Sequence, residues 1–224
     1  MDSAASTLKS QVYEQLLKKI LDNQFPMDTL LVESQLSAMF SCSRAPVREA
    51  LIELCRENIL RNIPRAGYQI VRISEKEMRD AFQFRVFLEL TGLELAFRRL
   101  TGENIRELKE IASLSDRVRA EGRSENTLEQ KMRINDQFHL RLSELSGNLL
   151  MHRTLETTIR LVRRGLAQIM LRENEIPVPY TTYHSGLVQA LENQDLEGAK
   201  ENLKNDILSF ESDIWSNLND RQSV

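Results

Sequence analysis

The stretch Ser43-Arg44-Ala45-Pro46-Val47-Arg48-Glu49-Ala50-Leu51 decides the fold of the first third of this chain. It predicts the start of a helix, because Ser43 suits an N-cap and a proline in the first turn loses no hydrogen bond. Arg44 and Arg48 stand four residues apart and therefore share one face of that helix. The opposite face carries apolar residues spaced to pack on a small core, namely Val47, Ala50, Leu51 and Leu54. One face would hold the fold, and the other would be free to lie in a groove of DNA.

The segments on either side predict a helix-turn-helix followed by a wing. Apolar residues at helical spacing indicate a helix over residues 8–21 and a shorter one over residues 31–40. Downstream, residues 59–63 and 68–71 are β-type runs around Pro64-Arg65-Ala66-Gly67, which is the pattern of a hairpin. An arginine at such a tip can enter the minor groove, where the negative potential favours it.

The rest of the chain predicts a helical bundle. Residues 74–77 form a capping box, so we expect domains at residues 1–73 and 78–224 with the cap between them. Residues 78–224 lack β-type alternation, and their breaks separate about six helices, as in an antiparallel bundle. These breaks are Thr101-Gly102, residues 121–124, Ser146-Gly147-Asn148, Pro177-Val178-Pro179 and Asn193-Gln194-Asp195. The expected fold is mainly α, a winged helix-turn-helix followed by an antiparallel α-helical bundle.

Polar residues occupy positions in the bundle where the helical period calls for apolar ones. Asn135 and His139 lie on the inward stripe of one helix, His184 on that of another, and Asp206 on that of the last. Buried polar groups need partners, and an i, i+4 pair is the spacing of paired helical metal ligands. Three interpretations remain open: a divalent-metal site, a polar or water-filled ligand pocket, and a dry hydrogen-bonded core.

Arg85 also lies on an inward stripe, that of the first bundle helix. A buried guanidinium requires a carboxylate. One hypothesis is an internal ion pair, for example with Glu89. The other is that Arg85 binds the carboxylate of an organic-acid effector that also contacts the metal.

Charge is distributed unevenly along a chain of 224 residues with a net charge of −3. Residues 40–73 contain six Arg and three Glu, whereas residues 74–224 contain 21 basic and 25 acidic residues. The basic segment is suited to a polyanion, and its DNA affinity should fall with salt. Cys42 and Cys55 cannot form a disulfide scaffold, and neither a membrane-length apolar run nor a signal-peptide core is present. We therefore expect a cytoplasmic protein that does not contact membranes.

These motifs resemble two domains of one family. The Ser43–Leu51 stretch and the Arg65-x-Gly67 wing resemble the winged helix of GntR-family transcription regulators. The resemblance implies that Arg44 and Arg48 contact bases or phosphates, Ser43 the DNA backbone, and Arg65 with Gly67 the minor groove. The alternative for Arg48 is an ion pair with Glu49 or Glu53 on a solvated helix face.

Residues Asn135 to His139 and His184 to Ala199 resemble the FCD effector domain of the FadR subfamily. In metal-binding members, Asp or Asn is followed four residues later by His, and two further histidines lie on the last two helices. This chain matches at Asn135, His139 and His184 and has Asp206 where the last histidine is usual. Asp206 is an acceptable ligand for Zn²⁺, Ni²⁺ or Mn²⁺.

Together these patterns predict a transcription regulator and not an enzyme. We expect a homodimeric repressor that binds a double-stranded DNA operator, because one winged helix contacts too few base pairs for useful specificity. A small organic-acid effector would shift the population of bundle arrangements and so change DNA binding. The alternative is a metal-dependent hydrolase with a DNA-binding appendage. It is disfavoured because Asp136 points off the inward stripe, which leaves no well-placed general base.

Overall fold

The computed structural model describes residues 7–22, 24–26, 29–120, 125–173 and 183–222. The chain divides into two units: Met1–Ser74 with Arg163–Asn174, and Glu75–Val162 with Glu175–Val224. The division after Ser74 falls within the expected cap, and the domain boundaries themselves stay a prediction. Among the described residues, no helix is both long and apolar enough to cross a membrane.

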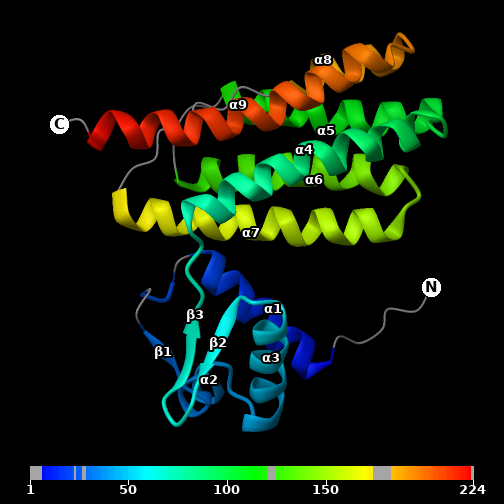
Figure 1. Cartoon of the computed structure of the whole chain (residues 1–224). Helices are drawn as coiled ribbons and strands as arrows, with labels where there is room; N and C mark the ends of the chain where they lie inside the picture. Colours follow the sequence, from blue (N-terminus) through cyan, green and yellow to red (C-terminus); the bar gives the residue numbers. More distant parts are fainter. Residues whose placement is uncertain (1–6, 23, 27–28, 121–124, 174–182, 223–224) are drawn as a thin grey trace. The chain divides into compact units, whose positions relative to one another are not determined.

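The first unit contains a winged helix (Figure 1). Its core is formed by α1, α2 and α3 packed with a small sheet, and all members of this apolar cluster are buried. The helix α1 begins where the Thr7 hydroxyl accepts a hydrogen bond from Ser10 N at 3.2 Å. The elements are α1 (Leu8–Leu21), β1 (Leu30–Leu31), α2 (Glu33–Met39), α3 (Arg44–Arg56), β2 (Leu60–Ile63) and β3 (Gly67–Ile70).

The prediction that the second helix begins at residue 31 was wrong. Leu31 lies in β1, where it pairs with Tyr68 of β3, and α2 begins at Glu33. The sheet has the order β1-β3-β2 with both pairs antiparallel. Pairing with a distant strand therefore overrides the local helical period at Leu31, as tertiary context often does.

Residues with positive φ angles follow the end of α3 and form the tip of the wing. Asn58, just past α3, has φ 54°, and Arg65 at the hairpin tip has φ 64°. Gly67 has φ 132°, and a Cβ added there would lie 2.6 Å from the Leu31 carbonyl oxygen. Only glycine suits this position, because it alone tolerates both the conformation and the close approach of β1.

The first unit also includes the end of α7 (Leu149–Glu173). There, Gln168 Oε1 accepts a hydrogen bond from Ile73 N at 2.8 Å, and Gln168 Nε2 donates to Val71 O at 3.2 Å. The chain that leaves the wing is thus held by a side chain from a distant part of the sequence.

The second unit is the predicted antiparallel bundle. The described residues form six helices from Glu75 onward, as expected from the breaks in the pattern. Residues 146–148 separate α6 from α7, and residues 193–195 separate α8 from α9, whereas the breaks at 121–124 and 177–179 lie outside the described residues. Besides α7, these helices are α4 (Glu75–Phe97), α5 (Gly102–Ala120), α6 (Glu125–Leu145), α8 (His184–Glu192) and α9 (Leu196–Gln222).

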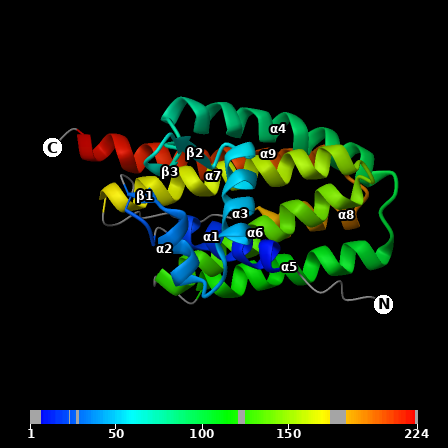
Figure 2. The ribbon, with the colours of Figure 1, turned by 90° about the horizontal axis from the view of Figure 1, so that it is seen from below.

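Five of these helices enclose the interior of the bundle. The packed pairs are α4 with α6, α6 with α5, α5 with α8, α8 with α9, and α9 with α4. Figure 2 shows α6 between α4 and α5, in agreement with these contacts. Inward side chains from α4, α6, α8 and α9 can therefore meet at the centre of this ring.

Candidate functional site

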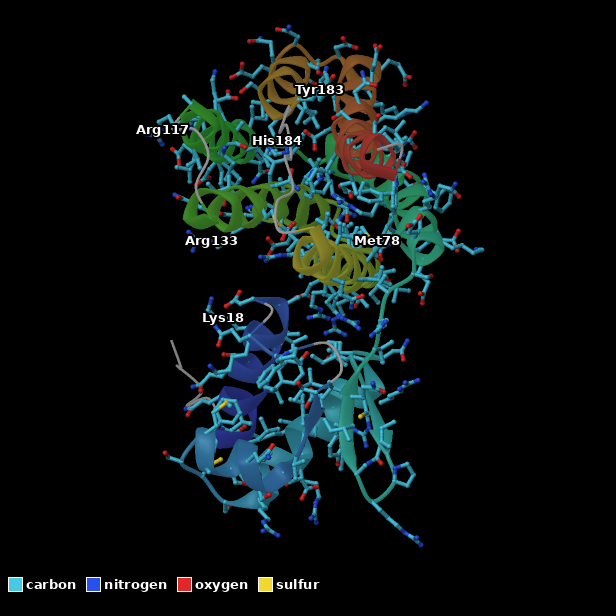
Figure 3. All side chains as sticks on the ribbon, turned by 90° about the vertical axis from the view of Figure 1, so that its left-hand side faces the viewer. Lys18, Met78, Arg117, Arg133, Tyr183 and His184 are labelled. Atoms are coloured by element: carbon cyan, nitrogen blue, oxygen red, sulfur yellow. The ribbon has the colours of Figure 1, made fainter. Side chains whose placement is uncertain are left out.

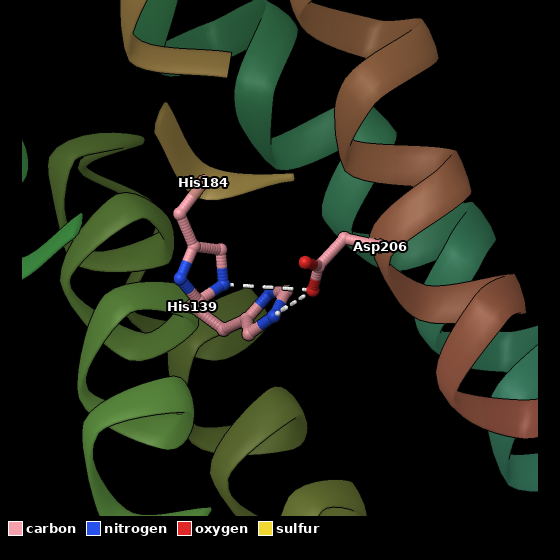
Figure 4. A group of neighbouring side chains, drawn as sticks. All are labelled: His139, His184 and Asp206. Atoms are coloured by element: carbon pink, nitrogen blue, oxygen red, sulfur yellow. Dashed lines mark hydrogen bonds and ion pairs between the residues drawn. The ribbon is translucent and has the colours of Figure 1, made fainter. Parts of the chain in front are cut away.

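Three buried side chains from α6, α8 and α9 meet inside the ring (Figure 4). His139 Nε2 lies 3.0 Å from Asp206 Oδ2, and His184 Nε2 lies 3.5 Å from the same oxygen. One ligand atom from each residue can be chosen so that all three lie within 4.8 Å of one another. The prediction that these side chains point inward is confirmed, since none is more than 4% exposed.

The surrounding residues fix two of these side chains. Tyr183 N donates to Asp206 Oδ1 at 2.8 Å, which directs the other carboxylate oxygen toward the histidines. The His184 ring stacks on Phe138, with centroids 4.0 Å apart and planes at 15°. Figure 3 shows Tyr183 and His184 side by side at the start of α8.

Glu89 completes the network and was not predicted as a member of the site. Its Oε2 accepts from His139 Nδ1 at 2.5 Å, and its Oε1 accepts from Arg85 Nε at 2.7 Å. The ion pair between Arg85 and Glu89 had been one of the two hypotheses for Arg85, and the structure contains it. Their i, i+4 spacing was the only signal in the sequence, because the contact with His139 spans 50 residues.

The network has a strong effect on ionisation. Burial lowers the pKa of His139, but the Glu89 carboxylate and hydrogen bonds to Asp206 and Glu89 outweigh it and raise this pKa to about 9. Burial raises the pKa of Asp206, but the two imidazoles hold it well below its usual range. The interior therefore stabilises positive charge between Asp206 and Glu89, as a cation site must.

The donor set fits a divalent transition metal. Among the described residues, the buried Nδ1 of His184 has no hydrogen-bond partner, and its Nε2 has only the 3.5 Å ion-pair contact with Asp206. Two ligands about 2.1 Å from one tetrahedral ion lie about 3.4 Å apart, and the Asp206 to imidazole distances of 3.0 and 3.5 Å bracket that value. Asn135 lies one turn before His139 on the same side of α6 and is buried, at 7% exposed.

The predicted DNA-contacting residues lie at one end of the winged helix. Ser43 is the N-cap residue of α3 with extended backbone, although its side chain makes no capping hydrogen bond. Arg44 and Arg48 follow in the first turns and are exposed. Figure 1 shows the β2–β3 turn, which contains Arg65, at the same end of this unit as the start of α3.

Arg48 does not make the contact expected of an arginine on a solvated helix face. Such an arginine would pair with Glu49 or Glu53 of the same helix, but Arg48 pairs with Glu33 of α2. Glu53 instead binds Lys9 of α1 at 2.5 Å.

A winged helix joined to a helical bundle with an interior polar site defines the class of one-component transcription regulators. The FCD domain family matches residues 80–208, and the family described as bacterial regulatory proteins, gntR family, matches residues 8–70. The chain belongs to the FCD-containing GntR family. Its members are DNA-binding transcription regulators and not hydrolases, so the enzyme alternative has no support from the family.

Individual relatives agree with this assignment. An HTH-type transcriptional regulator in an unstable DNA locus of Streptomyces ambofaciens is 26% identical over 93% of this chain and 85% of its own length. The McbR regulator of Escherichia coli is 26% identical over 76% of each chain. The structure of E. coli McbR/YncC has a TM-score of 0.77 at 20% identity, covering 94% of this chain and 98% of that one, which shows the shared fold.

Proposed function

We propose that this protein is a homodimeric repressor whose affinity for its DNA operator changes when a small organic acid binds in the bundle. The operator is contacted by Ser43, Arg44, Arg48, Arg65 and Gly67. The effector meets a divalent metal, Zn²⁺, Ni²⁺ or Mn²⁺, held by Asn135, His139, His184 and Asp206, and its carboxylate contacts Arg85. A protein that reads a bacterial operator works in the cytoplasm.

The observation that carries the proposal is the set of buried polar atoms without partners. Around the site these atoms are Nη2 of Arg85 and Nδ1 of His184, and Nε2 of His184 has only its 3.5 Å contact with Asp206; five further such atoms lie elsewhere among the described residues. Leaving such a group unpaired in the interior costs about 1–3 kcal/mol, and more if it is charged. A dry hydrogen-bonded core usually pairs such groups, and a cation beside an anionic ligand would satisfy both kinds of group here.

The chemistry of the two orphan groups indicates the effector. The Arg85 guanidinium is 2% exposed and shares one carboxylate with His139, so its free Nη2 is a fixed donor for a second anion. A metal ion in this position supplies Lewis-acid coordination for a carboxylate oxygen. Small carboxylates with oxygens for both groups are therefore the expected class of effector.

The name of one relative supports repression as the proposed sign of regulation. Gluconate operon transcriptional repressor from Bacillus licheniformis is 35% identical over 94 residues, which are 42% of this chain and 37% of that protein. Repression is proposed by analogy with this protein.

Dimerisation is supported by an exposed apolar face of α4. Phe84 and Phe87 are 43% and 69% exposed and stand three residues apart, so they share one side of the helix. Exposed apolar patches of this kind mark protein interfaces. A second copy covering them would give the two-fold symmetry that a palindromic operator requires.

Elemental analysis tests the proposal most directly. Gently purified wild-type protein is compared with His139→Ala and His184→Ala variants, and each is also titrated with Zn²⁺, Ni²⁺ and Mn²⁺. Near-stoichiometric metal in the wild type and its loss in both variants is the expected result. Wild-type protein that takes up none of the three metals would remove the metal from the proposal and leave a ligand pocket lined by Arg85 and the imidazoles.

A further inference from the structure

Arg48 is held by a carboxylate from another helix of the winged helix. Its Nε donates to Glu33 Oε1 at 2.9 Å, and its Nη2 donates to Glu33 Oε2 at 2.8 Å. The pair is bidentate, which is the strongest geometry for arginine and carboxylate. The Glu33 side chain is only 21% exposed, whereas that of Arg48 is 60% exposed.

Glu33 is itself fixed on two sides. It is the first residue of α2, where a carboxylate is stabilised by the helix dipole. The Tyr68 hydroxyl of β3 points at its Oε1 from 3.5 Å. The carboxylate therefore bridges α2, α3 and the wing strand, and its position does not depend on Arg48 alone.

The bidentate contact leaves one edge of the guanidinium available. Both N–H groups of Nη1 and the second N–H of Nη2 are not used by Glu33, and they form the end of a side chain that is mostly exposed. This end-on edge is the one that arginine presents to guanine O6 and N7 or to a phosphate. A free arginine would lose rotamer entropy on ordering its long side chain, and Glu33 has already restricted it.

We infer that Glu33 is a positioning residue that sets the DNA sequence specificity of this protein by holding Arg48 in a base-reading orientation. This inference rests on the proposed contact between Arg48 and DNA. The carboxylate repels phosphates, so it lowers affinity for any DNA while raising discrimination among sequences. An ion pair with only a structural role would not lower the affinity for all DNA and at the same time raise the discrimination among sequences.

The test measures discrimination with the full-length protein. An operator is first selected from random duplexes with the wild type, and affinities for it and for an unrelated duplex are measured by fluorescence anisotropy at one salt concentration. The variants are Glu33→Gln, Arg48→Ala and the double variant. Glu53→Gln serves as the charge control, because Glu53 lies on α3 but binds Lys9.

We expect Glu33→Gln to bind the unrelated duplex more tightly while the ratio of operator to unrelated affinity falls about 5-fold or more, a part of what a bidentate arginine contact supplies. Glu53→Gln should keep the wild-type ratio. In the Arg48→Ala background, Glu33→Gln should leave the ratio unchanged. Glu33→Asp keeps the charge but shortens the reach, so its ratio should fall without tighter binding to the unrelated duplex.

Several results would overturn the inference. A wild-type ratio in Glu33→Gln would do so, as would an equal fall in Glu53→Gln or in the Arg48→Ala background. If Glu33→Gln does not fold, Glu33→Asp decides the question alone, and an unchanged ratio in it rejects the inference. Failure of the underlying contact is distinguishable, because Arg48→Ala itself would then bind the operator with wild-type affinity.

Discussion

The Nδ1 atom of His139 lies 2.5 Å from Oε2 of Glu89, while Nε2 of the same ring faces Asp206 at 3.0 Å. Because ionised carboxylates only accept, both ring nitrogens carry protons in the metal-free protein; a metal would replace the proton on Nε2, while Glu89 keeps the proton on Nδ1. Outer carboxylates of this kind orient metal-bound histidines in many proteins. Arg85 on the same carboxylate links the expected effector contact to a metal ligand through one side chain.

Replacing Glu89 with Gln should weaken metal binding without removing a ligand. Loss of the charge on Glu89 leaves His139 less well oriented and less basic, so we expect about 10–100-fold lower affinity. Chelator competition measures it. Glu94→Gln is the matched control, because Glu94 is on the same helix but pairs with Lys200 on the surface. Equal metal affinity in Glu89→Gln and Glu94→Gln would rule out the orienting role.

Replacing Arg85 with Lys should remove the response to small carboxylates. Lysine keeps a positive charge beside Glu89 but loses the planar fork, so Nη2 is no longer presented. A hydrogen bond to a charged group contributes about 1.5–3 kcal/mol, so carboxylate affinity should fall roughly 10- to 150-fold. The measurement is calorimetric titration of the metal-loaded protein with acids that stabilise the wild type. Unchanged affinity would mean that Arg85 serves only its ion pair with Glu89.

Replacing Arg44 with Ala should weaken operator binding. Arg44 is the first residue of α3 and is exposed, so its loss leaves the fold intact but removes a contact worth about 1–3 kcal/mol. Electrophoretic or anisotropy titration should show an affinity for the operator that is roughly 5- to 150-fold lower, which is this free energy expressed as a ratio. Arg56→Ala at the other end of α3 is the control. Wild-type affinity in Arg44→Ala would contradict the assigned DNA face.

Replacing Phe87 with Glu should yield a folded monomer. A charge on the exposed apolar face of α4 cannot be buried against a second copy without a large desolvation cost. Light scattering after size exclusion would show half the wild-type mass, with an unchanged circular dichroism spectrum. Ile52→Glu, on an exposed position of α3, should remain dimeric. A dimeric Phe87→Glu protein would locate the interface elsewhere.

The carboxyl group of Glu33 should titrate below its ordinary range. The hydrogen bond from Arg48 outweighs the opposing effect of burial and lowers the pKa of Glu33 from 4.5. Since the folded-state pKa is depressed, the pair stabilises the domain above the unfolded pKa, and this stability is lost as pH falls through the lower, folded value. NMR titration of the Glu33 carboxyl carbon measures its pKa in the folded and in the unfolded protein. In Arg48→Ala the pKa should return toward 4.5, and no change would mean that the pair is absent in solution.

Local periodicity was enough to predict most of the framework. The four apolar residues chosen on α3 are its buried residues, and α1 has the predicted bounds, because helical spacing is a property of neighbouring residues. The burial of Arg85, Asn135, His139, His184 and Asp206 followed from the same period. Because an α-helix has 3.6 residues per turn, the sequence position alone gives the direction of a side chain, without any knowledge of its partner.

Contacts between distant segments could not be predicted in this way. Strand β1 exists only because Leu30 and Leu31 pair with Gln69 and Tyr68. The partner of Arg48 is 15 residues away on another helix, and not the nearby Glu49 or Glu53. In each case the polar or apolar pattern was visible, but the choice among several chemically equivalent partners depends on how the helices pack.

The orphan ring of His184 also offers a practical route to the effector. A ligand that binds the folded bundle and not the unfolded chain stabilises the folded state by about 2.7 kcal/mol at one hundred times its Kd. The midpoint of thermal unfolding rises as a result. Because the unpaired Nδ1 of His184 and Nη2 of Arg85 are buried within the described bundle, compounds that satisfy them bind in its interior and stabilise the folded state. Dye-reported melting of the whole chain against a collection of metabolites, with and without added metal, would therefore sort candidates before any operator sequence is known.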